Sequence, residues 1–92
     1  MTKHFLFALG QVMSTPHALT LAAKRQIDLK VLLHRHQTGD WGDLCEEDRV
    51  SNEEALVTDS RIFSSYQIGE DKIWIITEAD RRFTTLLLPD EY

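Results

Sequence analysis

The chain has 92 residues, of which 42% are hydrophobic and 27% are charged, and its formal net charge is −5. This length accommodates one globular domain over residues 1–92 without an elaborate internal cleft, and the acidic balance argues against general binding to nucleic-acid backbones. The single cysteine excludes an intramolecular disulfide, and no apolar run is long enough to form a signal peptide or cross a bilayer, so we expect a cytoplasmic protein with no membrane partner.

Charge is distributed unevenly along the chain. Residues 1–38 carry a net charge of +4, residues 39–60 carry −7 and residues 61–92 carry −2. The basic side chains of the first part are Lys3, Lys24, Arg25, Lys30 and Arg35. They keep a local nucleic-acid contact open as an alternative.

The first 40 residues predict one short extended segment and two helices. Residues 4–9 are typical of a short strand or an extended arm. Thr15 followed by Pro16 is a helix start, because a hydroxyl caps the first turn and proline loses no hydrogen bond there. Asp28 can cap a second helix that ends near Gly39. The apolar face of this second helix consists of Leu29, Leu32, Leu33 and His36.

A third helix is predicted to run to about Val57. Asp43 and Glu46 have the spacing of a capping box at its start. If Trp41 sets the phase at 100° per residue, Asp48 and Asn52 fall in the centre of the inward face. We therefore expect both to be buried and bonded to main chain near residues 39–42. Alternatively, Trp41, Asp48 and Asn52 line a recess and contact a ligand.

The hydrophobic period changes near residue 60. Residues 61–68, 72–78 and 83–88 are rich in β-branched and aromatic side chains and are separated by short turns. Short connections join antiparallel strands. We predict an α+β fold: a three-stranded antiparallel meander, which the N-terminal segment can join as an edge strand, with two or three short helices on one face.

Neither face of the predicted sheet is polar. Residues 73, 75 and 77 lie on one side of the middle strand, whereas Trp74 and Ile76 lie on the other, and Leu87 adds to the apolar surface of the next strand. Short helices can cover only one face. Trp74, Ile76 and Leu87 are therefore interface candidates, and a homodimer is the simplest way to cover them.

Other chemistry-bearing residues have ordinary explanations. His34 and His36 point about 200° apart on a helix, so they cannot share a metal ion, and we expect no metal and no cofactor. Cys45 has no local base and is typical of a small hydrophobic residue. Glu78, Asp80, Arg81 and Arg82 crowd the second hairpin turn, where acid–base work or ligand binding is conceivable and a solvated turn is the commoner case.

Two stretches carry a family resemblance. One is residues 36–48, HQTGDWGDLCEED, with Asn52; the other is residues 72–81, KIWIITEADR, followed by Thr84, Thr85 and the ending LLPDEY. They resemble a family of short proteins encoded on plasmids, integrative elements and prophages, some labelled as restriction-system subunits. The resemblance implies an accessory protein of mobile DNA, and it assigns no catalytic residue.

Three functions follow from these observations. The first is a non-enzymatic interaction protein, regulatory or counter-defence, that binds a protein partner through its acidic helix or its sheet. The second is a nucleic-acid accessory factor that uses Lys24, Arg25, Lys30 and Arg35. The third is a small enzyme or ligand binder built around Trp41, Asp48 and Asn52, or around Glu78 and Asp80, with Arg81 as a further binding candidate. The absence of a catalytic constellation favours the first.

Overall fold

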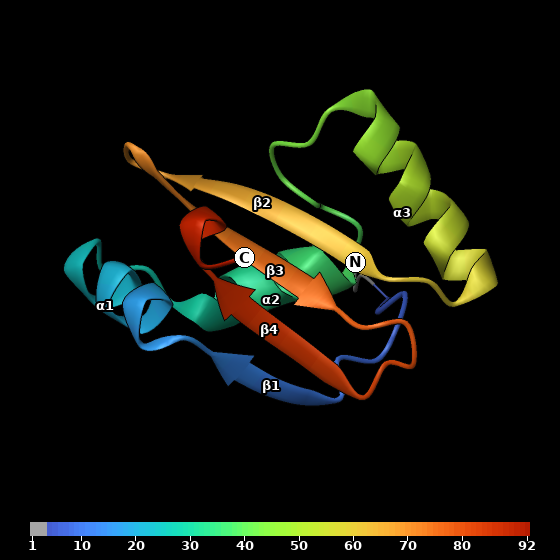
Figure 1. Ribbon diagram of the computed structural model, residues 1–92, viewed down its shortest axis with the longest axis horizontal. Helices are drawn as coiled ribbons and strands as arrows, with labels where there is room; N and C mark the ends of the chain where they lie inside the picture. The colour runs from blue at the N-terminus through green and yellow to red at the C-terminus, as the bar shows by residue number, and fades with distance from the viewer. Residues whose placement is uncertain (1–3) are drawn as a thin grey trace.

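The computed structural model describes residues 4–92, which form three helices, a four-stranded sheet and a short C-terminal turn (Figure 1). The helices are α1 (Pro16–Lys24), α2 (Leu29–Gln37) and α3 (Glu46–Thr58). The strands are β1 (Gln11–Ser14), β2 (Ile62–Ile68), β3 (Asp71–Thr77) and β4 (Phe83–Leu87), and the 3₁₀ turn η1 spans Pro89–Glu91. The predicted α+β class is confirmed.

The sheet has the order β1-β4-β3-β2. Strands β2, β3 and β4 pair antiparallel, and their bounds lie within about one residue of those expected from the hydrophobic period. The meander is therefore confirmed. Its fourth strand is β1, which pairs in parallel with β4.

The fourth strand comes from a different segment than we expected. Residues 4–9 form an arm and not a strand, and the strand starts only after Gly10, whose φ of +65° turns the chain. The arm crosses the end of α2: the Leu6 amide donates to the Gln37 carbonyl at 2.8 Å, and the Gln37 side chain donates to the Phe7 carbonyl at 2.9 Å. These bonds hold the arm on α2, and the Thr84 hydroxyl of β4 donates to the Leu9 carbonyl at its end.

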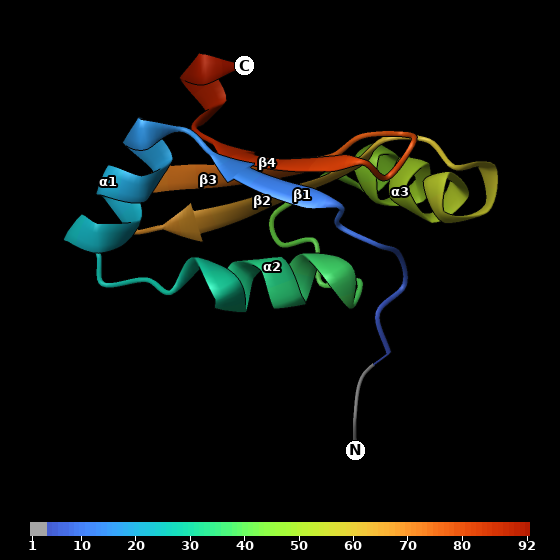
Figure 2. The ribbon, with the colours of Figure 1, turned by 90° about the horizontal axis from the view of Figure 1, so that it is seen from below.

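Helix α2 covers one face of the sheet, and α1 lies at the end of the sheet where β1 and β4 finish (Figures 1 and 2). Both start as predicted: the Thr15 hydroxyl accepts from the Ala18 amide, and the Asp28 carboxylate accepts from the Lys30 amide. Together they bury the main core against the sheet, which consists of Leu21, Leu32, Tyr66, Ile68, Ile73, Ile75 and Leu86. No helix of residues 4–92 is both long and apolar enough to cross a membrane.

Helix α3 lies beside the edge strand β2 and not over the sheet face (Figures 1 and 2). It packs through a second cluster in which Trp41, Ala55 and Ile62 are buried. The predicted capping box is wrong, because Cys45 occupies the N-cap position and no side chain caps the helix. Cys45 is exposed, so it is not the small core residue that the sequence suggested.

Candidate functional site

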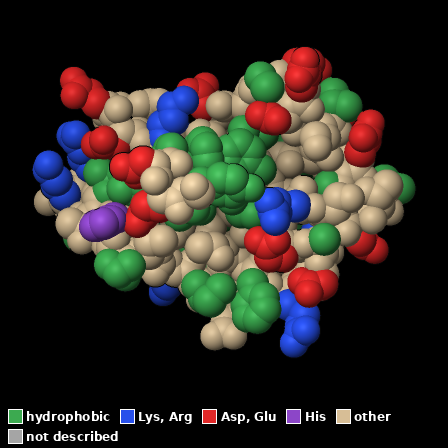
Figure 3. Space-filling view, viewed as in Figure 1, with side chains coloured by type: hydrophobic (Ala, Val, Ile, Leu, Met, Phe, Trp, Pro, Cys, Tyr) green, Lys and Arg blue, Asp and Glu red, His purple; other side chains and the backbone are tan. Residues whose placement is uncertain are grey.

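The sheet face opposite α2, here called the open face, carries an aromatic cavity of about 190 Å³. It is lined by Arg61, Phe63, Trp74, Ile76 and Tyr92. The Trp74 ring packs edge-to-face against two neighbouring rings. Its centroid lies 4.9 Å from that of Phe63 and 5.9 Å from that of Tyr92. Figure 3 shows hydrophobic side chains gathered over the middle of this face, with acidic and basic side chains around them. This arrangement can accept an apolar or aromatic group of a partner.

The cavity forms because β2 and β3 place their alternate residues on the same side. Phe63 pairs with Ile76, and Ser65 pairs with Trp74, in the antiparallel register. Successive strand residues point to opposite faces, so Phe63, Trp74 and Ile76 point away from the core that α2 covers. The small Ser65 side chain opposite Trp74 leaves room for the indole ring.

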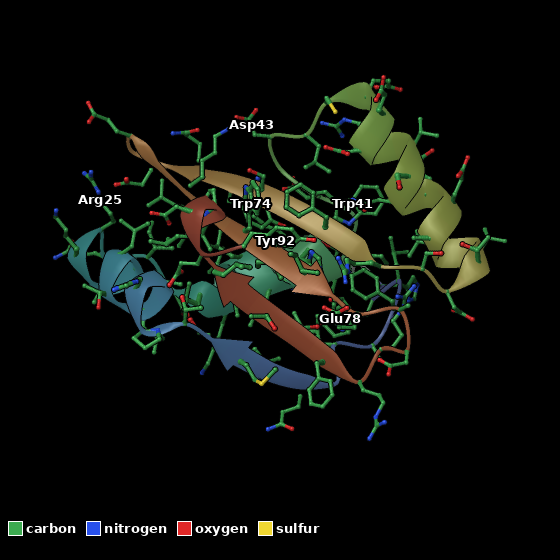
Figure 4. The ribbon with its side chains drawn as sticks, in the orientation of Figure 1. Arg25, Trp41, Asp43, Trp74, Glu78 and Tyr92 are labelled. Carbon is green, nitrogen blue, oxygen red and sulfur yellow. The ribbon has the colours of Figure 1, made fainter. Side chains whose placement is uncertain are left out.

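Tyr92 completes the cavity because η1 folds the end of the chain back over the sheet (Figure 4). Glu91 anchors this turn: its carboxylate accepts from the Thr15 hydroxyl and from the Leu88 amide, both at 2.8 Å. These bonds and the His17 ring, 3.0 Å away, hold the pKa of Glu91 below its usual value, with the Leu88 amide contributing most. The anchor therefore favours the ionised carboxylate.

A charged pair forms the polar rim of the cavity. The Arg61 guanidinium donates to the Tyr92 hydroxyl at 2.9 Å and lies 3.1 Å from the Glu78 carboxylate. Glu78 raises the pKa of Arg61, chiefly through its negative charge. Both side chains are about half exposed, so the pair orients Tyr92 but contributes little to stability.

The structure does not bring Trp41, Asp48 and Asn52 together. Trp41 is buried in the α3 cluster, where its indole N–H donates to the His36 carbonyl at 3.2 Å. Asp48 is exposed on the first turn of α3, so its predicted burial is wrong. The error arose because Trp41 precedes the helix, which begins at Glu46, and so cannot set the helical phase.

Asn52 is buried as predicted, with 2% of its surface exposed, but its partner is different. Its amide donates to the Phe63 carbonyl at 2.7 Å, and its carbonyl accepts from the Phe63 amide at 3.0 Å. Asn52 thus pairs with the outer edge of β2 and not with residues 39–42. It supports the strand that carries Phe63 and does not contact the cavity.

Replacing Asn52 with alanine should lower the free energy of unfolding by about 2 kcal/mol, because the Phe63 amide and carbonyl lose their partners. Asp48→Ala, one turn earlier on the same helix, should change it by no more than about 0.5 kcal/mol, since Asp48 is exposed. Urea unfolding of the two variants measures the difference. Equal losses in both would contradict the assignment.

The candidate residues of the β3–β4 turn have separate roles. Glu78 pairs with Arg61, and exposed Asp80 accepts from the Arg82 amide at 3.0 Å. The Arg81 guanidinium donates only to backbone carbonyls, those of Ala55, Ser60, Glu78 and Ala79. Arg81 therefore ties the end of α3 to the turn.

Of the three interface candidates, only Trp74 stays accessible. Ile76 and Leu87 keep 6% and 8% of their surface exposed, whereas Trp74 is half-buried. The chain end, through η1 and Tyr92, covers part of the apolar face that the sequence assigned to a second molecule.

Three residues of the cavity were not predicted from the sequence: Arg61, Phe63 and Tyr92. Phe63 had a usable signal, because it follows Ile62 in an alternating strand and faces Ile76 across the meander. Tyr92 had none, since the contact between η1 and α1 joins residues 76 apart in the chain.

Two of the four basic residues proposed for nucleic-acid contact are paired with acids. Arg35 makes two hydrogen bonds with Asp40, the shorter at 2.7 Å, and its guanidinium lies over the Tyr66 ring. Arg25 lies 3.6 Å from Asp71. Lys24 and Lys30 are exposed. The basic surface is consequently weaker than the count of bases suggested.

His36 lies in a closed polar network beneath the sheet. Its two ring nitrogens lie 2.6 Å from the Ser64 hydroxyl and 2.9 Å from the Thr77 hydroxyl. Burial, assisted by the charge of Arg81, lowers the pKa of His36 to about 3. The network has no access to the cavity. Within residues 4–92, no three His, Cys, Asp or Glu side chains gather closely enough to hold a metal ion.

Comparison with protein-family models, with curated proteins and with solved structures yielded no match to this chain.

Proposed function

We propose that this protein is a non-enzymatic interaction protein that binds a protein partner through the aromatic cavity on the open face of its sheet. The observation that carries the proposal is the accessible indole of Trp74, set between Phe63 and Tyr92 beside the Arg61–Glu78 pair. Aromatic and arginine side chains in such a setting dominate the energetics of protein interfaces.

The sheet is favoured over the acidic helix α3 as the contact surface. The carboxylates of the first turn of α3, Glu46, Glu47 and Asp48, are exposed and solvated. Exposed charges steer association more than they hold a complex together. The aromatic cavity, in contrast, offers apolar area that is removed from water on binding.

The geometry also argues against the two other functions. An enzyme built around Trp41, Asp48 and Asn52 requires these side chains in one place, and they lie apart. A nucleic-acid factor requires unpaired basic side chains, and Arg25 and Arg35 already pair with carboxylates.

The resemblance to short proteins of plasmids and prophages supports an accessory role, regulatory or counter-defence. The exposed thiol of Cys45 supports a reducing, cytoplasmic setting.

Affinity capture from cells of the source organism, followed by mass spectrometry, tests the proposal. We expect the wild-type protein to retain a protein that Trp74→Ser loses at least tenfold. The matched control is Val57→Ser, because Val57 lies on α3 with 84% of its surface exposed and does not line the cavity.

Three outcomes would count against this function: the same proteins retained by all three baits, retention that a nuclease abolishes, or no retained protein. Light scattering of the purified protein separates the homodimer from a different partner. A dimer at micromolar concentration that Trp74→Ser dissociates would make a second copy the occupant of the open face.

A further inference from the structure

The two edge strands of the sheet, β2 and β1, differ in whether their outer backbone groups are hydrogen-bonded. The outer edge of β2 is covered: Asn52 pairs with Phe63, and the Ser65 amide and carbonyl bond to the Trp41 carbonyl and the Asp43 amide at 3.1 and 2.7 Å. The outer edge of β1 has no such cover within residues 4–92. Figure 2 looks directly at this edge and shows β1 in front of the other strands.

The free groups of β1 can be identified from its bonds to β4. The Gln11 amide donates to the Arg82 carbonyl at 2.8 Å, and the Thr15 amide donates to the Leu86 carbonyl at 3.0 Å. Residues alternate along a strand, so Val12 and Ser14 turn their amides and carbonyls outward. Among the described residues, these backbone groups have no partner. An uncovered edge of this kind is a template for a further strand.

An apolar groove of about 470 Å³ lies under the β1 edge, between β1, α1 and α2. Its exposed apolar side chains include Val12 and Leu19, which keep 42% and 52% of their surface accessible. The partly buried Ile27, Leu29 and Leu33 lie deeper in it. A strand added to β1 would place every second side chain in this groove.

The charged side chains around β1 indicate which charges the added strand would carry. Lys30 lines the groove and Lys24 ends α1, and neither forms an ion pair within the described residues. Asp28 also lines the groove, and its carboxylate accepts a hydrogen bond from the Lys30 amide as a helix cap. The exposed Arg82 lies beside the other end of β1. A strand with carboxylates at its ends therefore matches this edge.

A second copy of the chain matches it less well. Antiparallel pairing of two β1 strands about a two-fold axis at Met13 would set Lys24 and Lys30 of one copy opposite Arg82 of the other. Like charges at both ends oppose such pairing. The four-residue strand also offers only a small part of the roughly 800 Å² per partner that a standard interface buries.

We propose that the β1 edge and the groove beneath it form a strand-addition site for an extended partner segment with alternating apolar side chains and flanking carboxylates. Main-chain bonds to Val12 and Ser14 hold the segment, and the groove selects its side chains. This site is separate from the aromatic cavity and does not depend on it.

The test uses synthetic seven-residue peptides with valine, isoleucine or leucine at alternate positions, threonine between them and aspartate at both ends. We expect micromolar to submillimolar binding and shifts of the Val12 and Ser14 amide signals in NMR spectra. Peptides with lysine in place of aspartate should bind at least threefold more weakly, and peptides with a central proline should not bind.

Val12→Pro is the informative variant, because it removes an outward amide while the bonds of Gln11 and Thr15 to β4 remain. It should weaken binding at least tenfold, whereas the matched Val12→Thr should bind within about twofold of wild type. If Val12→Pro fails to fold, Leu19→Glu on the exposed face of α1 blocks the groove and should weaken binding to a similar degree.

The proposal is wrong if no aspartate-flanked peptide binds at millimolar concentration, or if Val12→Pro folds and binds as wild type does. A concentration-dependent dimer that Val12→Pro dissociates would replace the peptide with a second copy. Loss of peptide binding in Trp74→Ser with β1 intact would place the peptide on the open face and likewise overturn the assignment.

Discussion

Lowering the pH from 6.5 to 5 should reduce the free energy of unfolding of this protein by about 2 kcal/mol through His36 alone. The ring is fully buried between Ser64 and Thr77, and burial, with the charge of Arg81, lowers its pKa from the ordinary 6.5 to about 3. The unfolded chain takes up a proton near pH 6.5, but the folded chain does not. The stabilisation is therefore complete above pH 6.5 and is lost as the pH falls towards 3.

Urea unfolding at half-unit steps between pH 7.5 and 5 measures this effect as a slope that approaches about 1.4 kcal/mol per pH unit below 6.5. Carboxylates titrate mainly below this window, so the slope reports the histidine. His36→Gln should be less stable and should lose the slope. His34→Gln is the matched control, since His34 lies on the same helix and is exposed, and it should keep the slope. A flat wild-type profile would contradict the closed network.

Gly42→Ala should destabilise the protein by about 3 kcal/mol or more, whereas Gly69→Ala should cost about 1 kcal/mol. Both glycines have a positive φ, +75° and +64°, so the backbone strain of the two substitutions is similar. At Gly42 the added methyl meets the Ser65 carbonyl and the Tyr66 ring. At Gly69 it meets only the flexible end of the Arg25 side chain.

The difference in destabilisation between Gly42→Ala and Gly69→Ala measures how tightly residues 41–43 are held against the β2 edge. Relief of the clash at Gly42 requires the segment to move away from Ser65, which breaks the two backbone bonds that Ser65 makes to Trp41 and Asp43. Thermal or urea unfolding of the pair provides the measurement. Equal losses would mean that the segment can yield without cost and that the edge is not held closed.

Features whose partners lie a few residues away were predictable from the sequence. The Thr15 and Asp28 caps each bond to an amide two or three positions ahead, so their residue types and spacing identify them. The three strands of the meander are joined by short turns, and their alternating apolar side chains pack on one core. Local geometry and burial pattern point to the same answer in these segments.

Features that depend on distant partners were not predictable. The phase of α3 depends on where the helix begins, and the packing of Trp41 against Ala55 and Ile62 decides that, so Asp48 was wrongly placed inside. Residues 4–9 were predicted as a short strand or an extended arm, and nothing local shows that the strand begins at Gln11 and pairs with β4 some 70 residues further on.

The aromatic cavity also combines features that the sequence predicts with features that only the tertiary structure sets. Alternation along β3 was sufficient to identify Trp74 as an outward-facing aromatic residue. Its accessibility, and the burial of Ile76 and Leu87 beside it, was set by tertiary structure. The chain end reaches this face through the bond between Thr15 and Glu91, which brings Tyr92 over the indole ring. A sequence specifies which side chains a strand turns outward through its period of two, whereas contacts between distant segments form only once the whole core is packed.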